Sequence, residues 1–171
     1  PDFLPVRNLV RSGKLGRIYS IDARINAWGS SADFGVKEFR QKWRLESNWG
    51  GGALYDWGVH LLDQLGQVHT ASPKTVHALL RTGNWAKDCD DYASGMVHFD
   101  NGMVAFVEAS AITRVKLPRY RILGTKGMAV SGWWMNGTRL FPESFMQQVG
   151  RPKTVLPRVK GGHEADFLNA I

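Results

Sequence analysis

The sequence predicts an α+β fold with a mainly antiparallel sheet. Two observations predict it: apolar residues recur first at helical spacing and then at period two, and most strand-like segments follow one another with no helix between them. Consecutive strands of this kind pair through hairpins, which makes the sheet antiparallel. With 171 residues, the chain has the length of one domain, 1–171. The predicted helices span 2–12 and the segment after the glycines at 50–52, and the predicted strands span 17–28, 74–81, 92–99, 103–112, 119–123 and 128–130.

Apolar patterns define the first helix and the first strand. Helical spacing runs from Phe3 to Val10, and Gly13 follows the last turn, where glycine is common. From residue 17 to 28 the pattern has period two, with polar residues on one side. The pattern therefore predicts a half-buried strand. Its apolar side consists of Tyr19, Ile21, Ala23, Ile25 and Ala27.

Residues 29–52 form a long irregular segment that ends in a glycine triplet. A loop of this length inside a compact domain is usually functional or disordered. Trp43 and Trp49, on either side of Arg44, argue against disorder. We therefore expect this loop to contribute to a functional site.

Two hairpins are predicted in the second half of the chain. Asn101-Gly102 suits a two-residue type I′ turn, and Gly124-Thr125-Lys126-Gly127 joins a second strand pair. With the first turn, residues 97, 99, 104 and 106 share one face of the sheet and residues 96, 98, 105 and 107 the other. Because both sets are largely apolar, we expect helices to cover one face and another element, such as a second subunit, to cover the other.

Cysteine content and hydropathy exclude several classes of protein. Cys89 is the single cysteine, so neither an intrachain disulfide nor a cysteine-based zinc site can form, and a reducing, cytoplasmic location is expected. The longest apolar runs have about five residues, too few for a membrane span, and the sequence shows no signal-peptide pattern. We therefore expect no membrane partner.

Basic residues concentrate in the last third of the chain. The net charge is +7, and the stretch from Arg114 to Lys160 holds most of the excess. No recognition helix or set of stacking aromatics accompanies these bases, so we expect no nucleic-acid partner. A solvated face, a surface for an acidic partner and a site for an anionic substrate group remain open.

The segment from Gly50 to Leu65 has the pattern of a functional helix. At about 100° per residue, Asp56, His60 and Asp63 lie on one stripe, and the apolar residues lie on another. A carboxylate four residues before an imidazole stabilises the imidazolium and fixes its orientation, which suits a general base for a hydroxyl proton. The preceding glycines let backbone or ligand approach the helix N-terminus.

Other interpretations of this segment stay open from the residues alone. An Asp-His pair four apart can be an ordinary surface pair, and glycine triplets are often only turns. Asp56, His60 and Asp63 are all acceptable metal ligands, although the other four histidines form no strong partner motif. That arrangement would be a metal-dependent hydrolase.

Gly50 to Asp63 resembles the G-G-G-x-L-x-D-x-G-x-H-x-x-D signature of a known family, in its C-terminal domain. This is the glucose-fructose oxidoreductase / inositol dehydrogenase / rhizopine catabolism protein family, usually written Gfo/Idh/MocA. Every fixed position matches, and the further similar segments span nearly the whole chain. They are Ser12–Gly16, Trp43-Arg44, Phe99–Gly102, Gly124–Gly127 and Asp166–Ile171.

The resemblance implies an α+β substrate-binding and oligomerisation domain. Its large antiparallel sheet has helices on one face, and the open face makes the contact in a homo-oligomer. The implied reaction is hydride transfer between NAD or NADP and a sugar, polyol or related hydroxyl compound. His60 and Asp56 are then the catalytic residues.

The resemblance also implies roles for five further residues. Asp63, Arg44 and Trp43 are expected to bind the substrate. Gly51 and Gly52 are expected to contact the cofactor, and no metal is implied.

The resemblance further implies a longer parent chain. The present chain has no G-x-G-x-x-G turn and no Glu-Lys-Pro segment, which in the family belong to a preceding N-terminal Rossmann domain. It starts at Pro1 and stops at Ile171, inside a predicted helix over 163–171, so it is expected to be truncated at both ends. We expect the fragment alone to bind no cofactor and to be inactive; a non-catalytic sugar-binding or assembly module of the same fold is the alternative.

Overall fold

A computed structural model describes residues 3–27, 43–82, 84–115, 117–132, 138–142 and 154–155. Helix α1 (Phe3–Arg11) and strand β1 (Ile18–Asn26) open the fold, and the 3-10 turns η1 (Trp43–Leu45) and η2 (Ser47–Trp49) follow. Residues 29–42 of the predicted loop over 29–52 lie outside the described residues, as does the predicted helix over 163–171. The remaining elements are the π-helical turn η3 (Leu54–Gly58), α3 (Val59–Val68), β2 (Pro73–Arg81), β3 (Tyr92–Phe99), β4 (Val104–Ser110), β5 (Tyr120–Gly124), β6 (Gly127–Ser131), β7 (Arg139–Pro142) and β8 (Thr154–Val155).

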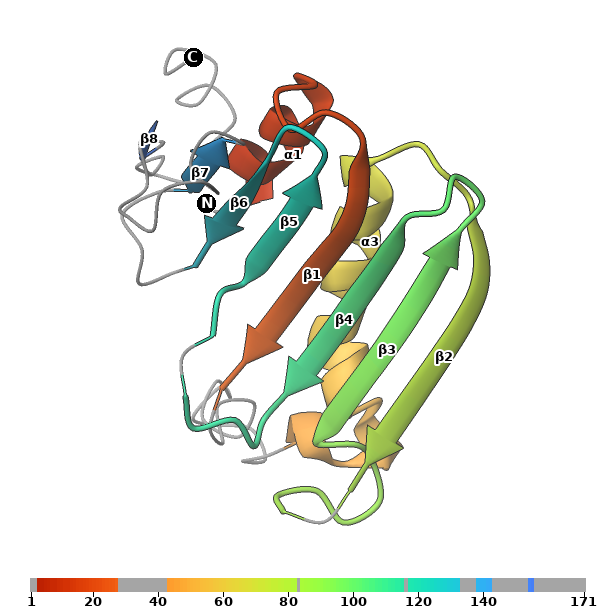
Figure 1. Cartoon of the computed structure of the whole chain (residues 1–171). Coiled ribbons are helices and arrows are strands. Elements are labelled where there is room, and N and C mark those ends of the chain that lie inside the picture. Colours follow the sequence, from red (N-terminus) through yellow and green to blue (C-terminus); the bar gives the residue numbers. More distant parts are fainter. Residues whose placement is uncertain are drawn as a thin grey trace.

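The described strands form one mixed sheet, with the order β2-β3-β4-β1-β5-β6-β7-β8. All neighbouring strands are antiparallel except β1 and β4, which run parallel. Helices α1 and α3 lie on one face of this sheet, and the other face is open in the view of Figure 1. The predicted α+β class, with a mostly antiparallel sheet and helices on one face, is confirmed.

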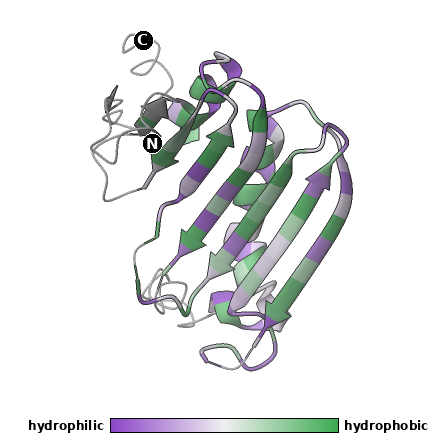
Figure 2. Cartoon of the chain, in the orientation of Figure 1, coloured by the Kyte–Doolittle hydropathy of each residue, from purple (hydrophilic) through white to green (hydrophobic). Residues whose placement is uncertain are grey.

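The core lies between the helices and the covered face of the sheet. Alternation along β1 places Ile21, Ala23 and Ile25 in this core, and Figure 2 shows hydrophobic and hydrophilic residues alternating along β1. On the helices, every third or fourth residue packs against these strands. The buried core cluster includes Val6, Leu9, Leu15, Ile21, Leu61, Leu65, Val97, Phe99, Met103, Val107, Tyr120 and Ile122.

Two details of β1 differ from the alternating pattern. Tyr19 was assigned to the apolar side, but its side chain is 50% exposed, because the register shifts between Ile18 and Ser20 at the start of the strand. Asp22 lies on the polar side, yet it is only 1% exposed. Two arginines bind its carboxylate, so the polar side of this strand is not simply solvated.

The register of the first hairpin is also different from the prediction. Val97 pairs with Ala105 and Met96 with Phe106, because the loop has three residues, 100–102. The Phe99 N–H donates to the Met103 carbonyl at 2.9 Å, and Gly102 has φ 83°, which fits a loop that ends in a left-handed residue. The predicted two-residue turn and the predicted grouping of faces are therefore wrong by one position.

The corrected register separates the two faces of the sheet. Val97, Phe99, Ala105 and Val107 all lie beneath the helices and are buried. On the open face, Met96 pairs with Phe106, which is 42% exposed. Because His98 pairs with Val104 on the same open face, only the covered face is apolar at all of these positions. The second predicted hairpin, through residues 124–127, is confirmed, since Gly124 pairs with Gly127.

Among the described residues, no helix is long and apolar enough to cross a membrane.

Candidate functional site

The candidate site is built around η3 and α3, residues 54–68, which we call the site helix. The two 3-10 turns before it fold back so that consecutive N–H groups find acceptors within the chain. Gly50, Gly51 and Gly52 donate to the carbonyls of Ser47, Glu46 and Arg44 at 2.9, 3.0 and 2.8 Å. The chain therefore enters the site helix along a fixed path.

The glycine triplet is required by close packing along this path. A Cβ at Gly51 would lie 2.6 Å from the Arg44 carbonyl oxygen. At Gly52, where φ is 130°, a Cβ would lie 2.5 Å from Oδ1 of Asp90. Both glycines are buried against the chain's own backbone and carboxylate.

Asp56 and Arg44 form the central ion pair of the site. Nε of Arg44 donates to Oδ1 of Asp56 at 3.2 Å, and the side chains are 27% and 19% exposed. The second carboxylate oxygen, Oδ2, is buried and has no hydrogen-bond partner. Asp56 therefore has one oxygen held by Arg44 and a second oxygen enclosed by the chain.

The pKa of Asp56 is raised above its ordinary value of 3.8. Burial is the largest cause, because it penalises the charged form. The Coulomb attraction of Arg44, its hydrogen bond and the nearby His60 all lower this pKa but do not compensate fully. Burial thus makes the charged form of Asp56 unfavourable in the folded protein.

His60 lies four residues after Asp56 on the site helix, and its side chain is exposed. It is close enough to act on the charge of Asp56. Exposed apolar side chains surround this part of the helix: Tyr55, Val59 and Leu62 are 69%, 43% and 45% exposed. An imidazole in such a setting is accessible to a ligand that covers the helix.

The other two predicted substrate-binding residues have different surroundings. The guanidinium of Arg44 lies over the Trp43 ring, with Cζ 4.2 Å from the ring centroid, so Trp43 supports Arg44 by a cation–π contact. Asp63 is exposed, and its Oδ2 accepts a hydrogen bond from Nε2 of Gln67 at 2.8 Å. The fold brings Arg44, Trp43 and Asp56 together. Asp63 instead pairs with Gln67, one turn further along the helix.

The first turn of the site helix is π-helical, which sequence periodicity did not predict. The Val59 N–H reaches back to the Leu54 carbonyl, five residues earlier. π-helical turns are rare in proteins, and those that occur often lie at functional sites. The apolar stripe predicted at 100° per residue holds for Leu61, Leu65 and Val68, which are buried, while Leu54 and Trp57, within the π turn, are only half-buried.

The N–H groups around the glycine triplet decide whether the phosphates of a dinucleotide can bind at the start of the site helix. An anion site at a helix N-terminus needs N–H groups that point outward. The N–H groups of residues 50–54 all donate to acceptors of this chain. These residues do not fit the phosphates of a dinucleotide, and contact of Gly51 or Gly52 with another part of a cofactor stays a prediction.

Metal binding by the site helix would require several ligand side chains to lie close together. Among the residues that the structure describes, no group of three histidine, cysteine, aspartate or glutamate side chains could hold a metal ion. The hydrolase interpretation therefore has no support in the described geometry.

The raised pKa of Asp56 leads to a stability prediction. Because the folded protein holds the proton more tightly than the unfolded chain, wild type should lose stability relative to Asp56→Asn as the pH rises above 3.8. Urea unfolding of both proteins across the acid range up to neutral pH measures this difference. If wild type instead becomes more stable relative to Asp56→Asn as the pH rises, the Arg44 ion pair lowers the Asp56 pKa more than burial raises it.

Most of the chain matches a known family model. Residues 3–130 match the family model of the GFO/IDH/MocA C-terminal domain. The chain belongs to the GFO/IDH/MocA family. It is 27% identical over 148 residues to a D-xylose dehydrogenase of Paenarthrobacter nicotinovorans, an alignment that covers 77% of this chain and 38% of that protein. The chain thus spans less than half the length of this relative.

Solved structures of GFO/IDH/MocA-like proteins share the fold. An NAD-binding protein from Listeria innocua is 27% identical, with a TM-score of 0.70 over 88% of this chain and 41% of that one. An inositol dehydrogenase homologue from Azotobacter vinelandii, complexed with NAD⁺, is 20% identical, with a TM-score of 0.72 over 97% of this chain and 43% of that one. Our chain is thus an oxidoreductase-family C-terminal domain, and its described part contains no Rossmann fold.

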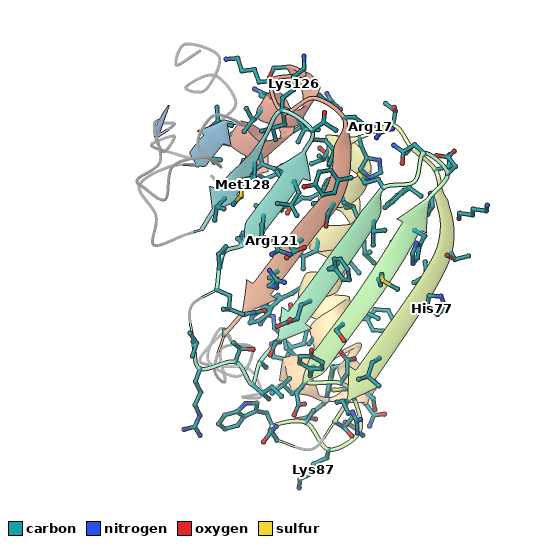
Figure 3. The ribbon with its side chains drawn as sticks, in the orientation of Figure 1. Arg17, His77, Lys87, Arg121, Lys126 and Met128 are labelled. Carbon is teal, nitrogen blue, oxygen red and sulfur yellow. The ribbon has the colours of Figure 1, made fainter. Side chains whose placement is uncertain are left out.

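Sequence reasoning missed two groups of residues. Asp90, from the loop before β3, accepts a hydrogen bond from the Leu54 N–H at 2.8 Å. On the open face, Asp22 binds Arg24 and Arg121, each at 2.9 Å, beside a hollow of about 590 Å³. Figure 3 shows Arg121 of β5 and His77 of β2 on this face. The run Asp88-Cys89-Asp90-Asp91 was the available signal for the first group.

Proposed function

We propose that this domain is the substrate-binding half of an NAD- or NADP-dependent oxidoreductase that oxidises a hydroxyl group of a sugar, polyol or related compound. The observation that carries the proposal is the arrangement of Asp56. Arg44 holds one of its oxygens, the other is buried without a partner, and the exposed His60 follows four residues later. All three residues lie within the matched family region.

The residues of this chain divide the work on the substrate. His60 removes the proton from the hydroxyl that is oxidised, since an imidazole nitrogen can accept a proton as a general base. Asp56 stabilises the imidazolium and orients the substrate by accepting a hydrogen bond from a neighbouring hydroxyl. Arg44 and Trp43 keep Asp56 in place, and Asp63 is assigned to the outer edge of the substrate site.

The nicotinamide is held by a separate Rossmann domain of the complete protein in this proposal. When bound, it accepts the hydride from the carbon that bears the hydroxyl. Exposed Tyr55, Val59 and Leu62 fit contact with that domain or with the bound substrate. We expect the isolated chain to be inactive, because the residues of the glycine triplet do not cradle phosphates.

Relatives support this substrate class. The D-xylose dehydrogenase acts on a sugar by its name, and one structure of the Azotobacter vinelandii homologue holds NADH and myo-inositol. Both compounds carry adjacent hydroxyl groups. A molecule of that kind could engage His60 and Asp56 with neighbouring oxygens.

Titration of the complete protein with NADH and NADPH tests the proposal. Energy transfer from tryptophan to the reduced nicotinamide should saturate for the complete protein and be absent for the isolated domain. A panel of sugars and polyols, D-xylose and myo-inositol among them, should then include a compound that reduces the bound nucleotide. Sugar binding without turnover would instead favour a non-catalytic sugar-binding or assembly module.

A homo-oligomer formed through the open face of the sheet is part of the proposal. Phe106 and Leu79 are 42% and 47% exposed on this face, beside the Asp22 ion cluster. Exposed apolar groups of this size around a paired charge cluster are typical of a surface that becomes covered.

Phe106→Asp should therefore convert the complete protein to a smaller assembly with a lower molar mass in solution. The reason is that the contact between subunits would have to bury the new carboxylate. Light scattering after gel filtration measures the mass. Val76→Asp is the matched control, since Val76 is 61% exposed and pairs with Val97 on the opposite side of the same sheet. An unchanged mass in Phe106→Asp would contradict the proposed interface.

A further inference from the structure

Asp90 contacts the start of the site helix at three consecutive residues. Its Oδ2 accepts the Leu54 N–H at 2.8 Å, and its backbone carbonyl accepts the Ala53 N–H at 2.8 Å. Its Oδ1 occupies the space that a Cβ at Gly52 would need. The carboxylate is buried, with the residue 7% exposed. No side-chain cap comes from the helix's own N-cap residue, so this contact takes that place.

Asp90 is itself fixed to the end of the sheet. The next residue, Asp91, donates its N–H to the Arg81 carbonyl and accepts the Ala111 N–H, both at 2.9 Å. These bonds join the ends of β2 and β4 just before β3 begins. The Asp91 carboxylate is 1% exposed and accepts three N–H groups of the same loop, from Asn84, Trp85 and Ala86.

A short chain of contacts runs from Asp90 to Asp56. Leu54, whose N–H Asp90 binds, is the first residue of the π turn. Gly52 accepts the Asp56 N–H at 2.8 Å, and donates its own N–H to the carbonyl of Arg44. Arg44 in turn binds the Asp56 carboxylate. A shift of the helix start would therefore move both partners of the ion pair.

We propose that Asp90 is a positioning residue, whose carboxylate sets the place of the first helical turn, and through it of Asp56 and His60, relative to the sheet. The inference rests on the proposed function, because it assigns these two side chains to the reacting hydroxyl groups. Asp90 acts through hydrogen bonds and touches neither the substrate nor the reacting atoms.

The test compares Asp90→Ala and Asp90→Asn in the complete protein. Asparagine keeps a side-chain oxygen for the Leu54 N–H, and alanine does not. Because a misplacement of about 1 Å can cost about 10²-fold in rate, we expect Asp90→Ala to lower kcat about 30- to 100-fold and to change KM less than about threefold. Asp90→Asn should retain kcat within about threefold, since the hydrogen bond is kept.

Asp88→Ala is the matched control. Asp88 lies in the same loop, is fully exposed and binds Ser47 of η2, not the site helix. It removes the same charge and should leave kcat unchanged. Exchange of the Leu54 amide hydrogen reports directly on its hydrogen bond to Asp90. The exchange should be slow in wild type and Asp90→Asn and fast in Asp90→Ala.

Two results would overturn the positioning role. The first is wild-type kcat in Asp90→Ala together with fast exchange at Leu54. The second is an equal loss of kcat in Asp90→Asn and Asp90→Ala, which would mean that the charge acts and not the hydrogen bond. If Asp90→Ala does not fold, Asp90→Asn decides: wild-type kcat with a protected Leu54 amide supports the role, and a large loss of kcat overturns it.

Failure of the proposed function gives a different pattern. In that case wild type shows no turnover with any sugar or polyol, whichever nucleotide is supplied. The exchange of the Leu54 amide in the same variants still shows whether Asp90 anchors the site helix.

Discussion

Replacing His60 with alanine is expected to lower kcat of the complete enzyme about 10²- to 10⁴-fold, the usual loss when a general base is removed. His60 lies four residues beyond Asp56 on the site helix and is exposed, so its removal leaves the core intact. The free energy of unfolding should therefore change by less than about 0.5 kcal/mol. Steady-state oxidation of the substrate and urea unfolding of the same preparations measure the two effects.

Chemical rescue makes this prediction specific. Imidazole added to the solution should restore part of the rate, because it can enter the space that the side chain leaves. Unchanged kcat in His60→Ala would remove His60 from the mechanism.

Replacing Gly52 with alanine is expected to have the largest effect on stability. A side chain at φ 130° is strained, and its Cβ would lie 2.5 Å from Oδ1 of Asp90. Because that carboxylate is buried and bound to Leu54, it cannot move without loss of a hydrogen bond. Strain of about 1–3 kcal/mol and loss of a charge-assisted hydrogen bond predict a loss of about 3–5 kcal/mol.

Gly66→Ala is the matched control for this variant. Gly66 lies in α3, and a Cβ there would meet nothing within 4 Å. Alanine in a helix interior is more favourable than glycine by about 1 kcal/mol, so this variant should gain stability. Urea unfolding of the complete protein compares the two. Equal effects of Gly52→Ala and Gly66→Ala would show that the Asp90 contact does not constrain the site helix.

Local patterns predicted most of the fold, because each element carries its own periodicity. Residues 2–12 and 92–99 were placed within one or two residues of α1 and β3. The predicted length of the first hairpin loop was wrong, because Asn101-Gly102 suits both a two-residue and a three-residue loop. The choice between the two depends on how Phe99 pairs with Met103. Local sequence does not encode that pairing.

The site shows the same division between local and long-range information. The spacing of Asp56 and His60 can be read from one helix, whereas the Arg44–Asp56 pair depends on how the preceding turns fold back. The N–H of Leu54, where the π turn starts, likewise has its acceptor in a carboxylate 36 residues later. Asp22 looked like a solvated strand residue, and only its arginine partners on β1 and β5 explain its burial.

The most direct test of the central claim follows the hydrogen atom itself. The complete protein, mixed with NAD⁺ or NADP⁺ and a polyol deuterated at the carbon that is oxidised, should form reduced nicotinamide that carries the deuterium. In a single turnover, His60→Ala should form it about 10²-fold more slowly or worse. Reduced nicotinamide without deuterium, or formation at the wild-type rate in His60→Ala, would contradict the account.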